Sequence, residues 1–340
     1  MKKQILLLVS LLLIACKSFS QEKIWQVKVF SFFDNIEFGG SGVKMPQTMS
    51  GIMVAPEAGL RWDSVHRISA GVNLMHEFGS GTAIENFYPV AYYNYSKGPV
   101  RFLMGAFPRD YVTGKYPRLF FQDSVYYYRP NVEGISLEYS REEGYVNVWL
   151  DWTGRQALQV NEAFFTGLSA KYCQGILYLR HFGYMYHFAG KEDPLIDEAL
   201  HDNLLFHTSM GIDLSGKTFF EKLDFNAGWV TGLERARADN TGWIKRHGML
   251  IEAGAEYKGV GLFNTLYSGK GLMYFYSDHS TDLYWGDPAY RAGNYNRTDI
   301  YLKFLRARRV NMEFTWSLHF LESNMYHEQM LIVRVDLNNL

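Results

Sequence analysis

The sequence is 340 residues long, with 34 Lys and Arg, 35 Asp and Glu, and a formal net charge of −1 at pH 7. This balance argues against a nucleic-acid-binding protein, which needs a strongly basic face. Tyr and Phe are abundant, at 24 residues each, although the mean hydropathy is only −0.18. That combination suits β-strands that are apolar on one side only.

The N-terminus has the features of a secretory signal peptide. Two lysines precede an apolar run at residues 5–14, which is too short for a transmembrane helix, and small residues follow it. We therefore expect residues 1–20 to be a signal peptide and residues 21–340 to form a single domain. An alternative cut would leave Cys16 as a lipidated first residue.

Removal of the signal peptide would change both the charge and the cysteine content. Three lysines and no acid would be lost, so 31 of the 34 basic residues would remain against 35 acidic ones, a net charge of −4. Cys173 would be the remaining cysteine, so no disulfide framework is expected.

Alternation of apolar and polar residues predicts β-strands along most of the mature chain. In residues 310–320, for example, Phe314 and Trp316 share one face while Glu313 and Thr315 share the other. Between residues 176 and 186 the two faces cannot be told apart. The predicted strands cover residues 25–29, 57–62, 68–75, 89–95, 100–106, 135–139, 147–152, 164–172, 176–186, 204–214, 223–229, 247–257, 260–266, 300–304, 310–320 and 331–337.

The connections between these strands alternate in length. One set is short: 63–66, 96–99, 141–144, 173–175, 215–221, 258–259 and 306–309. The other set is mostly longer: 35–50, 79–86, 108–131, 153–161, 189–203, 232–246, 267–297 and 321–327. Short turns on one rim and long loops on the other are typical of outer-membrane barrels. We predict an all-β, closed antiparallel transmembrane β-barrel of about sixteen strands, with short periplasmic turns and long extracellular loops. A soluble sandwich or propeller is the alternative.

On this architecture the chain resembles Gram-negative outer-membrane porin-type β-barrels, and the resemblance implies a location in the outer membrane. Aromatic residues near the predicted strand ends, such as Trp62, Trp152 and Trp229, resemble the interfacial girdles of that class. One departure is the C-terminus, since such barrels usually end on an aromatic residue and this chain ends on Leu340.

If the apolar face meets lipid, the polar face lines the lumen. In the hairpin that contains residues 310–320, this places Lys303, Glu313 and His319 toward water. The predicted pore-lining residues are Lys28, Arg61, Arg101, Glu138, Asp151, Lys171, Asp213, Asp224, Glu252, Glu256, Lys303, Glu313 and Arg334. Charges of both signs on one face suit a hydrated interior, in which they either set a weak ion preference or pair across the wall.

Two long loops, 108–131 and 267–297, combine aromatic and charged residues and are candidates to fold inward as a constriction. The constriction candidates are Arg109, Arg118, Arg129, Asp282, Trp285 and Asp287. Aromatic rings beside carboxylates suit sugar-like solutes, while packing of the loops on one another as a lid is the alternative.

These features lead us to expect a porin-like channel for small hydrophilic solutes, with outer-membrane lipid and the solutes as its partners. The alternatives are an export barrel for polysaccharide or a component of a secretion or uptake complex. We expect no cofactor, no metal site and no nucleic-acid partner.

An enzyme is a third alternative. His207-Thr208-Ser209 resembles the base and hydroxyl pair of outer-membrane phospholipases. Those enzymes display the pair toward lipid, whereas the alternation here turns His207 and Ser209 into the lumen. We therefore expect no catalytic residue and no enzyme.

Overall fold

The computed structural model describes residues 21–191, 200–238 and 242–339. The predicted signal peptide at residues 1–20, including Cys16, lies outside these ranges. Within them, no helix is both long and apolar enough to pass through a membrane.

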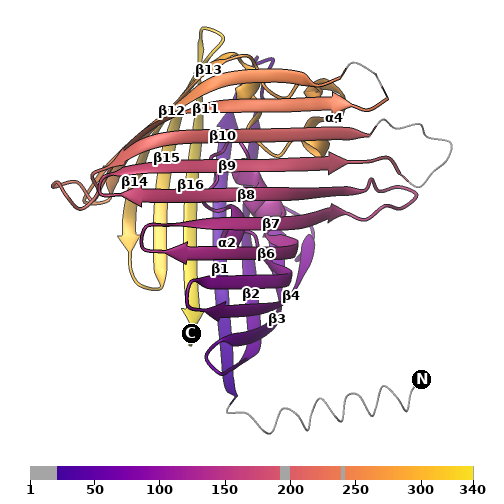
Figure 1. The fold of residues 1–340 in the computed structure, drawn as a ribbon, viewed down its shortest axis with the longest axis vertical. Coiled ribbons are helices and arrows are strands. Elements are labelled where there is room, and N and C mark those ends of the chain that lie inside the picture. Colours follow the sequence, from indigo (N-terminus) through magenta and orange to yellow (C-terminus); the bar gives the residue numbers. More distant parts are fainter. Residues whose placement is uncertain (1–20, 192–199, 239–241, 340) are drawn as a thin grey trace.

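The described residues form sixteen antiparallel strands that close into a barrel, with β1 (Glu22–Glu37) paired to β16 (Asn324–Asn338) (Figure 1). The remaining strands are β2 (Gln47–Trp62), β3 (His66–Glu77), β4 (Asn86–Lys97), β5 (Val100–Pro108), β6 (Asn131–Arg141), β7 (Gly144–Gly154), β8 (Ala163–Gln174), β9 (Leu177–Phe188), β10 (His201–Asp213), β11 (Lys222–Ala236), β12 (Ile244–Tyr257), β13 (Val260–Gly269), β14 (Asn294–Arg306) and β15 (Val310–Leu321). Closure leaves no unpaired sheet edge in the bilayer, where a free backbone group would be costly. The predicted fold class is confirmed.

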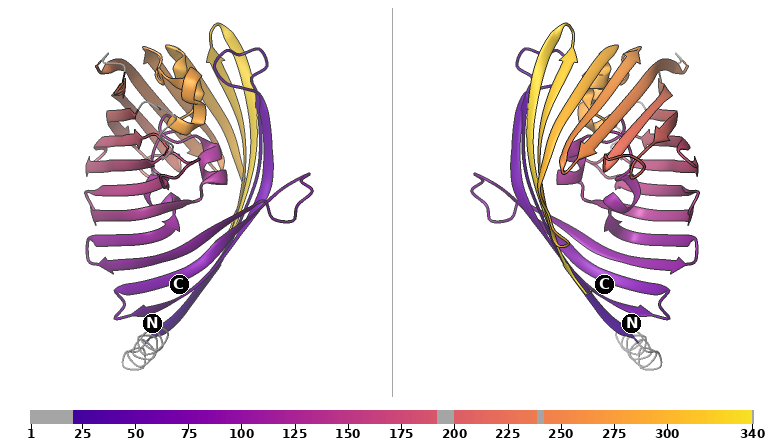
Figure 2. Two further views of the ribbon diagram at one scale, coloured as in Figure 1. Left: turned by 90° about the vertical axis from the view of Figure 1, so that its right-hand side faces the viewer. Right: turned by 90° about the vertical axis from the view of Figure 1, so that its left-hand side faces the viewer.

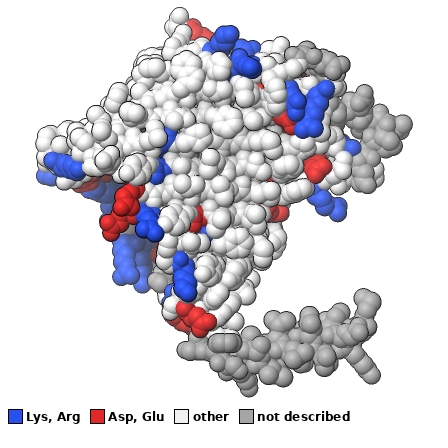
Figure 3. Space-filling view, in the orientation of Figure 1, with Lys and Arg blue, Asp and Glu red and all other residues white. Residues whose placement is uncertain are grey.

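The alternation along each strand sorts side chains between lipid and lumen. On β15, Phe314 and Trp316 are 38% and 41% exposed, whereas Thr315 and Ser317 are buried. Large apolar side chains at the outer surface are stable only if that surface meets lipid. Figure 3 shows the same division, because charged residues gather toward the ends of the molecule and the wall between them is mostly uncharged.

His319, on the inward face of β15, departs from the expectation that it faces water. Its side chain is fully buried, because extracellular connections fill the lumen at that level.

The strand connections agree with the predicted short turns, and one predicted long loop is also short. Residues 321–327 contain only a two-residue turn, Glu322 and Ser323, both with positive φ. Positive φ at both central positions is the geometry that matches the twist of a hairpin. The start of β1 and the end of β16 meet at the periplasmic rim, where the Asn339 side chain accepts from the Trp25 backbone N–H at 2.7 Å.

The structure also resolves the two faces of β9, which the sequence leaves open. Tyr178 points inward and is 4% exposed, whereas Leu177 and Leu179 point outward. The Tyr178 ring lies over Gly211 on β10, where an added Cβ would come within 2.3 Å of it. Tyr301 lies in the same way over Gly261, with a corresponding distance of 2.1 Å.

Two extracellular connections fold into the barrel instead of extending away from it (Figure 2). The β5–β6 connection contains α2 (Asp110–Thr113) and α3 (Asp123–Tyr128). The β13–β14 connection contains α4 (Tyr276–Leu283) and the 3-10 helix η1 (Pro288–Arg291). Together they place most of the buried apolar core in the extracellular half of the lumen.

Candidate functional site

The two inward connections are joined to each other inside the lumen. The Gln122 N–H donates to the Trp285 carbonyl at 2.8 Å, and the Asp287 N–H donates to the Arg118 carbonyl at 2.9 Å. The ring of Phe121, which is 1% exposed, packs against Trp285 at 6.4 Å between centroids. The extracellular half of the lumen is therefore a packed aromatic core.

Arg109 and Arg129 help to hold this core in place. The Arg109 guanidinium is buried and donates to Asp151 Oδ2 at 2.6 Å and to the Arg129 carbonyl at 2.6 Å. Both arginines lie over the Trp285 ring, at 5.0 and 4.9 Å from its centroid. The backbone of Asp282 is also tied to the wall, since its carbonyl accepts from the Tyr186 hydroxyl at 3.2 Å.

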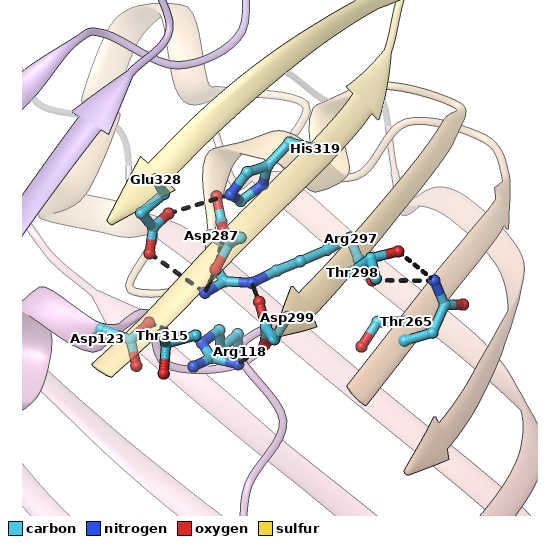
Figure 4. Close-up of polar contacts among 12 residues, drawn as sticks. Arg118, Asp123, Thr265, Asp287, Arg297, Thr298, Asp299, Thr315, His319 and Glu328 are labelled. Carbon is cyan, nitrogen blue, oxygen red and sulfur yellow. Dashed lines mark hydrogen bonds and ion pairs between the residues drawn. The ribbon is translucent and has the colours of Figure 1, made fainter. Parts of the chain in front are cut away.

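A buried ionic network connects the core to strands β14, β15 and β16 (Figure 4). At its centre, Arg297 contacts Asp299 at 2.6 Å, Glu328 at 3.2 Å and Asp287 at 3.9 Å. His319 Nε2 lies 3.3 Å from Glu328 Oε2. These side chains are all at most 5% exposed, so each charge depends on the others for compensation.

The extracellular connections supply further charges to this network. Lys44, from the β1–β2 connection, lies 3.2 Å from Asp287, and Arg118 lies 3.1 Å from Asp299. Burial disfavours the charged form of Asp287, but Lys44 and Arg297 outweigh it and hold its pKa below the usual value. Burial likewise opposes the charge on Lys44, yet Asp287 and Glu328 raise its pKa. The network thus joins three extracellular connections (β1–β2, β5–β6 and β13–β14) to the wall through charge.

Below the core, on the periplasmic side, the lumen contains a cavity of about 690 Å³. Five of the predicted pore-lining residues line it: Lys28, Asp224, Glu252, Glu313 and Arg334. Arg180 and Glu252, both at the cavity wall, form an ion pair at 2.6 Å.

The other predicted pore-lining residues are distributed between wall contacts and the periplasmic rim. Four of them are in ion pairs: Lys303 with Glu256 at 2.6 Å, Glu138 with Lys115 at 4.0 Å, Asp151 with Arg109, and Arg61 with Glu22 at the rim. Two lie over aromatic rings, Arg101 over Tyr111 and Lys171 over Tyr178. Asp213 accepts a hydrogen bond from the Ser215 backbone N–H. Many of the inward charges therefore have a partner across the wall. The sequence reasoning did not identify Arg297, Asp299 or Glu328 as one cluster.

His207 and Ser209 lie on the inward face of β10 and are buried. Among the described residues, neither the imidazole nor the hydroxyl has a hydrogen-bond partner. A lipid chain in the bilayer cannot reach them, because the wall lies between. Nor do the described residues contain a group of three or more His, Cys, Asp or Glu side chains arranged to hold a metal ion.

A different histidine lies on the lipid-facing side, at the extracellular end of β3. His76 Nδ1 is 3.1 Å from the Thr82 carbonyl oxygen and 3.7 Å from Glu85 Oε2. Because a carbonyl only accepts, Nδ1 carries the proton in this contact, and Nε2 is the basic nitrogen. Sequence alternation gave no reason to select His76, but its spacing from Ser80, Thr82 and Glu85 is visible in the sequence.

Glu85 is fixed as a charged partner of this histidine. It accepts from the Thr82 hydroxyl at 2.5 Å and from the Glu77 N–H at 2.9 Å. These two hydrogen bonds lower the pKa of Glu85. The surrounding side chains include Phe78 and Phe87, which are 53% and 64% exposed. A base, a carboxylate and exposed apolar side chains therefore meet where the barrel leaves the membrane.

Comparison with solved structures finds outer-membrane barrels at low sequence identity. A loop L8 deletion mutant of OmpT, an outer membrane protein of Vibrio cholerae, aligns with a TM-score of 0.57 and 10% identity over 94% of this chain and 100% of that one. An anion-selective porin from Comamonas acidovorans aligns with a TM-score of 0.56 and 10% identity over 94% and 99%. OccK2 (OpdF) of Pseudomonas aeruginosa aligns with a TM-score of 0.52 and 11% identity over 94% and 98%.

These structures share the fold and confirm the resemblance in architecture to porin-type barrels. A search of curated proteins finds no match to the chain.

Comparison with family models matches residues 18–334 to the lipid A 3'-O-deacylase-type family. This match overturns the expectation that the protein is not an enzyme, because the family is one of enzymes. The expectation was wrong because it rested on His207 and Ser209 as the candidate catalytic pair, and both of these residues face the lumen. The match spans most of the sequence, and the chain belongs to the lipid A 3'-O-deacylase-type family of outer-membrane proteins.

Proposed function

We propose that this barrel is an outer-leaflet esterase that hydrolyses an ester-linked acyl chain of lipid A or a closely related glycolipid. The family supplies the substrate class. The observation that carries the proposal is the outward position of His76 and Glu85 at the extracellular end of β3. Acyl ester bonds of an outer-leaflet glycolipid lie at this level, between the hydrocarbon chains and the polar headgroup.

In the proposed reaction His76 is the general base. Its Nε2 takes a proton from a water molecule, and the water oxygen attacks the ester carbonyl carbon. The imidazolium then returns the proton to the leaving alkoxide as the acyl C–O bond breaks. The products are a free fatty acid and the alcohol, and water is the only co-reactant.

Glu85 and the neighbouring loop hold the base in its working state. The carboxylate lies beside Nδ1 and stabilises the imidazolium as it forms. The Thr82 carbonyl fixes the tautomer with Nε2 unprotonated. Phe78, Ile84 and Phe87 are exposed around the pair and would contact the acyl chain.

The filled lumen is consistent with chemistry at the outer surface. Phe120, Phe121 and Tyr284, which come from the two inward connections, are almost completely buried inside the barrel. A solute that crossed the barrel in this conformation would have to displace that core, whereas a lipid reaches His76 from the bilayer without entering the lumen.

The test is acyl release from purified lipid A in mixed micelles, measured by mass spectrometry. For a general base, His76→Gln should lower kcat by about 100-fold or more with little change in KM. His66 is a matched control, because it lies on the same face of the same strand at the periplasmic rim and contacts the Tyr93 hydroxyl at 2.6 Å. His66→Gln should retain wild-type activity.

Two results would reject the proposal. The first is a folded wild-type protein that releases no acyl chain from any ester-linked lipid A. The second is a His76→Gln variant that is as active as wild type, which would show that His76 is not the general base.

A second candidate function is a channel for small hydrophilic solutes. The cavity of about 690 Å³ on the periplasmic side, with its charges of both signs, favours it. Diffusion across the membrane would require the two inward connections to move. Conductance in planar bilayers tests this, and a folded barrel that stays silent at all voltages would exclude it.

A further inference from the structure

A group of outward-facing polar side chains lies at the extracellular ends of β9 to β11. Asp202 on β10 pairs with Arg235 on β11 and with His187 on β9 in the strand register. Their neighbours in sequence, Tyr186 and Glu234, are buried on the inward side. The alternation therefore directs Asp202, Arg235 and His187 toward the outside of the barrel.

Asp202 holds two guanidinium groups side by side. Its Oδ2 accepts from Arg235 Nε at 2.7 Å and from Arg237 Nε at 2.9 Å, while its Oδ1 accepts from Arg237 Nη2 at 2.9 Å. His187 Nδ1 lies 3.4 Å from the same carboxylate. Arg235 is further fixed by the Trp243 ring, which lies 4.3 Å from its Cζ. The shared carboxylate orients both arginines without neutralising both charges.

Both arginines keep part of their hydrogen-bonding capacity available to the surroundings. The Arg235 and Arg237 side chains are 34% and 47% exposed. A guanidinium has five N–H donors, and Asp202 uses one from Arg235 and two from Arg237. Two adjacent, oriented guanidinium groups suit a phosphate, whose oxygens accept such donors in pairs.

The surroundings identify the phosphate as one carried by a lipid. Trp229 and Met249, further into the membrane on β11 and β12, are 57% and 42% exposed and form an apolar surface. A molecule with its phosphate on the arginines would lay its acyl chains along this surface. A free phosphate ion would gain nothing from it.

We propose that Arg235 and Arg237 bind the headgroup phosphate of an outer-leaflet lipid, at a site separate from the proposed catalytic residues. In the closed strand order of the described residues, β10 and β11 are seven positions from β3 and β4, nearly the opposite side of the barrel. One lipid cannot occupy both places. This site would anchor the barrel among phosphorylated lipids, and it does not depend on the proposed esterase activity.

Native mass spectrometry in detergent tests the proposal by counting retained lipid. The probes are bis-phosphorylated lipid A, the same lipid with its phosphates removed, and inorganic phosphate. We expect wild type to retain the phosphorylated lipid, and Arg235→Gln/Arg237→Gln to bind it about tenfold more weakly or worse, as for the loss of a charge-assisted bidentate contact. Arg237→Gln alone, beyond the end of β11, should weaken retention while leaving the strand pairing intact.

Arg141 supplies the matched control. It is an exposed arginine that stacks on the Tyr139 ring at 5.4 Å, but at the periplasmic end of β6. Arg141→Gln should retain the lipid as wild type does.

Equal retention by wild type and the Arg235→Gln/Arg237→Gln variant would overturn the proposal. So would equal retention of the dephosphorylated lipid, or binding of inorganic phosphate as tight as that of the lipid, since each removes the need for a lipid phosphate. The readout requires no hydrolysis, so its failure and a failure of the esterase proposal are distinguishable.

Discussion

Replacing Arg297 by methionine should destabilise the barrel by several kcal/mol. The guanidinium lies within 4 Å of three buried carboxylates, at 2.6 Å from Asp299, 3.2 Å from Glu328 and 3.9 Å from Asp287. Methionine fills a comparable volume, so the main effect is loss of the charge. Removing one partner from a buried ionic cluster typically costs about 3–5 kcal/mol, because the remaining charges stay buried without compensation.

The remaining cations of the network reduce this cost. Lys44 still contacts Asp287 and Glu328, at 3.2 and 3.6 Å, and Arg118 still contacts Asp299 at 3.1 Å. No carboxylate therefore loses its only cation, and we expect a value near the lower end, about 3 kcal/mol.

The assay is equilibrium unfolding of the refolded barrel in detergent, titrated with guanidinium chloride and followed by tryptophan fluorescence. Arg61→Met is the control, because Arg61 forms an ion pair with Glu22 at the periplasmic rim, where the two side chains are 36% and 53% exposed. Its unfolding midpoint should stay at the wild-type value. If Arg297→Met unfolds together with wild type, or if both variants shift equally, the buried network does not stabilise this barrel in the way described.

Three further predictions concern other parts of the barrel. Because Lys44 and Arg297 hold the pKa of Asp287 below its usual 3.8 despite burial, the unfolded chain binds protons more readily. The free energy of unfolding should fall as the pH drops below 3.8, and this fall should be less steep in Asp287→Asn than in wild type, measured by the same titration at a series of pH values. Gly261→Ala should displace the Tyr301 ring and lower the unfolding midpoint by a measurable amount in the same titration. Trp316→Arg should cost about 2–4 kcal/mol if its outward position meets the middle of the bilayer, and a cost near zero in lipid vesicles would contradict that placement.

The strand order was predictable because lipid and water impose opposite requirements on the two faces of a strand. On β15 the apolar set with Phe314 and Trp316 and the polar set with Thr315 and Ser317 separate cleanly in the sequence, and the structure exposes and buries them accordingly. The short turns were predictable for a related reason, since the alternation stops where the chain reverses. The face of β9 that meets lipid was ambiguous in the sequence, because the ring of Tyr178 is apolar, as are the side chains of its outward neighbours Leu177 and Leu179.

The ionic network could not be predicted, because its members are distant in sequence. Lys44, Asp287 and Glu328 come from three different parts of the chain. Strand alternation assigns Glu328 to the inward face but gives no information on which loop reaches it. The β13–β14 connection turns inward because it packs against the wall and the β5–β6 connection, and such contacts between distant segments cannot be read from local sequence.

Departures from alternation contain information that the strand pattern alone does not use. In the extracellular halves of β1, β2 and β5, the inward residues Phe32, Met53 and Phe107 are apolar and at most 5% exposed. A water-filled lumen would not select such side chains, so apolar residues on both faces of a strand indicate a filled interior. The reverse departure is a polar residue on the lipid face, and His76 is one. Such a residue is stable only near the rim, where water and headgroups can solvate it, and that is also where a lipid-modifying group must lie. The two departures together favour chemistry at the outer surface over passage through the lumen.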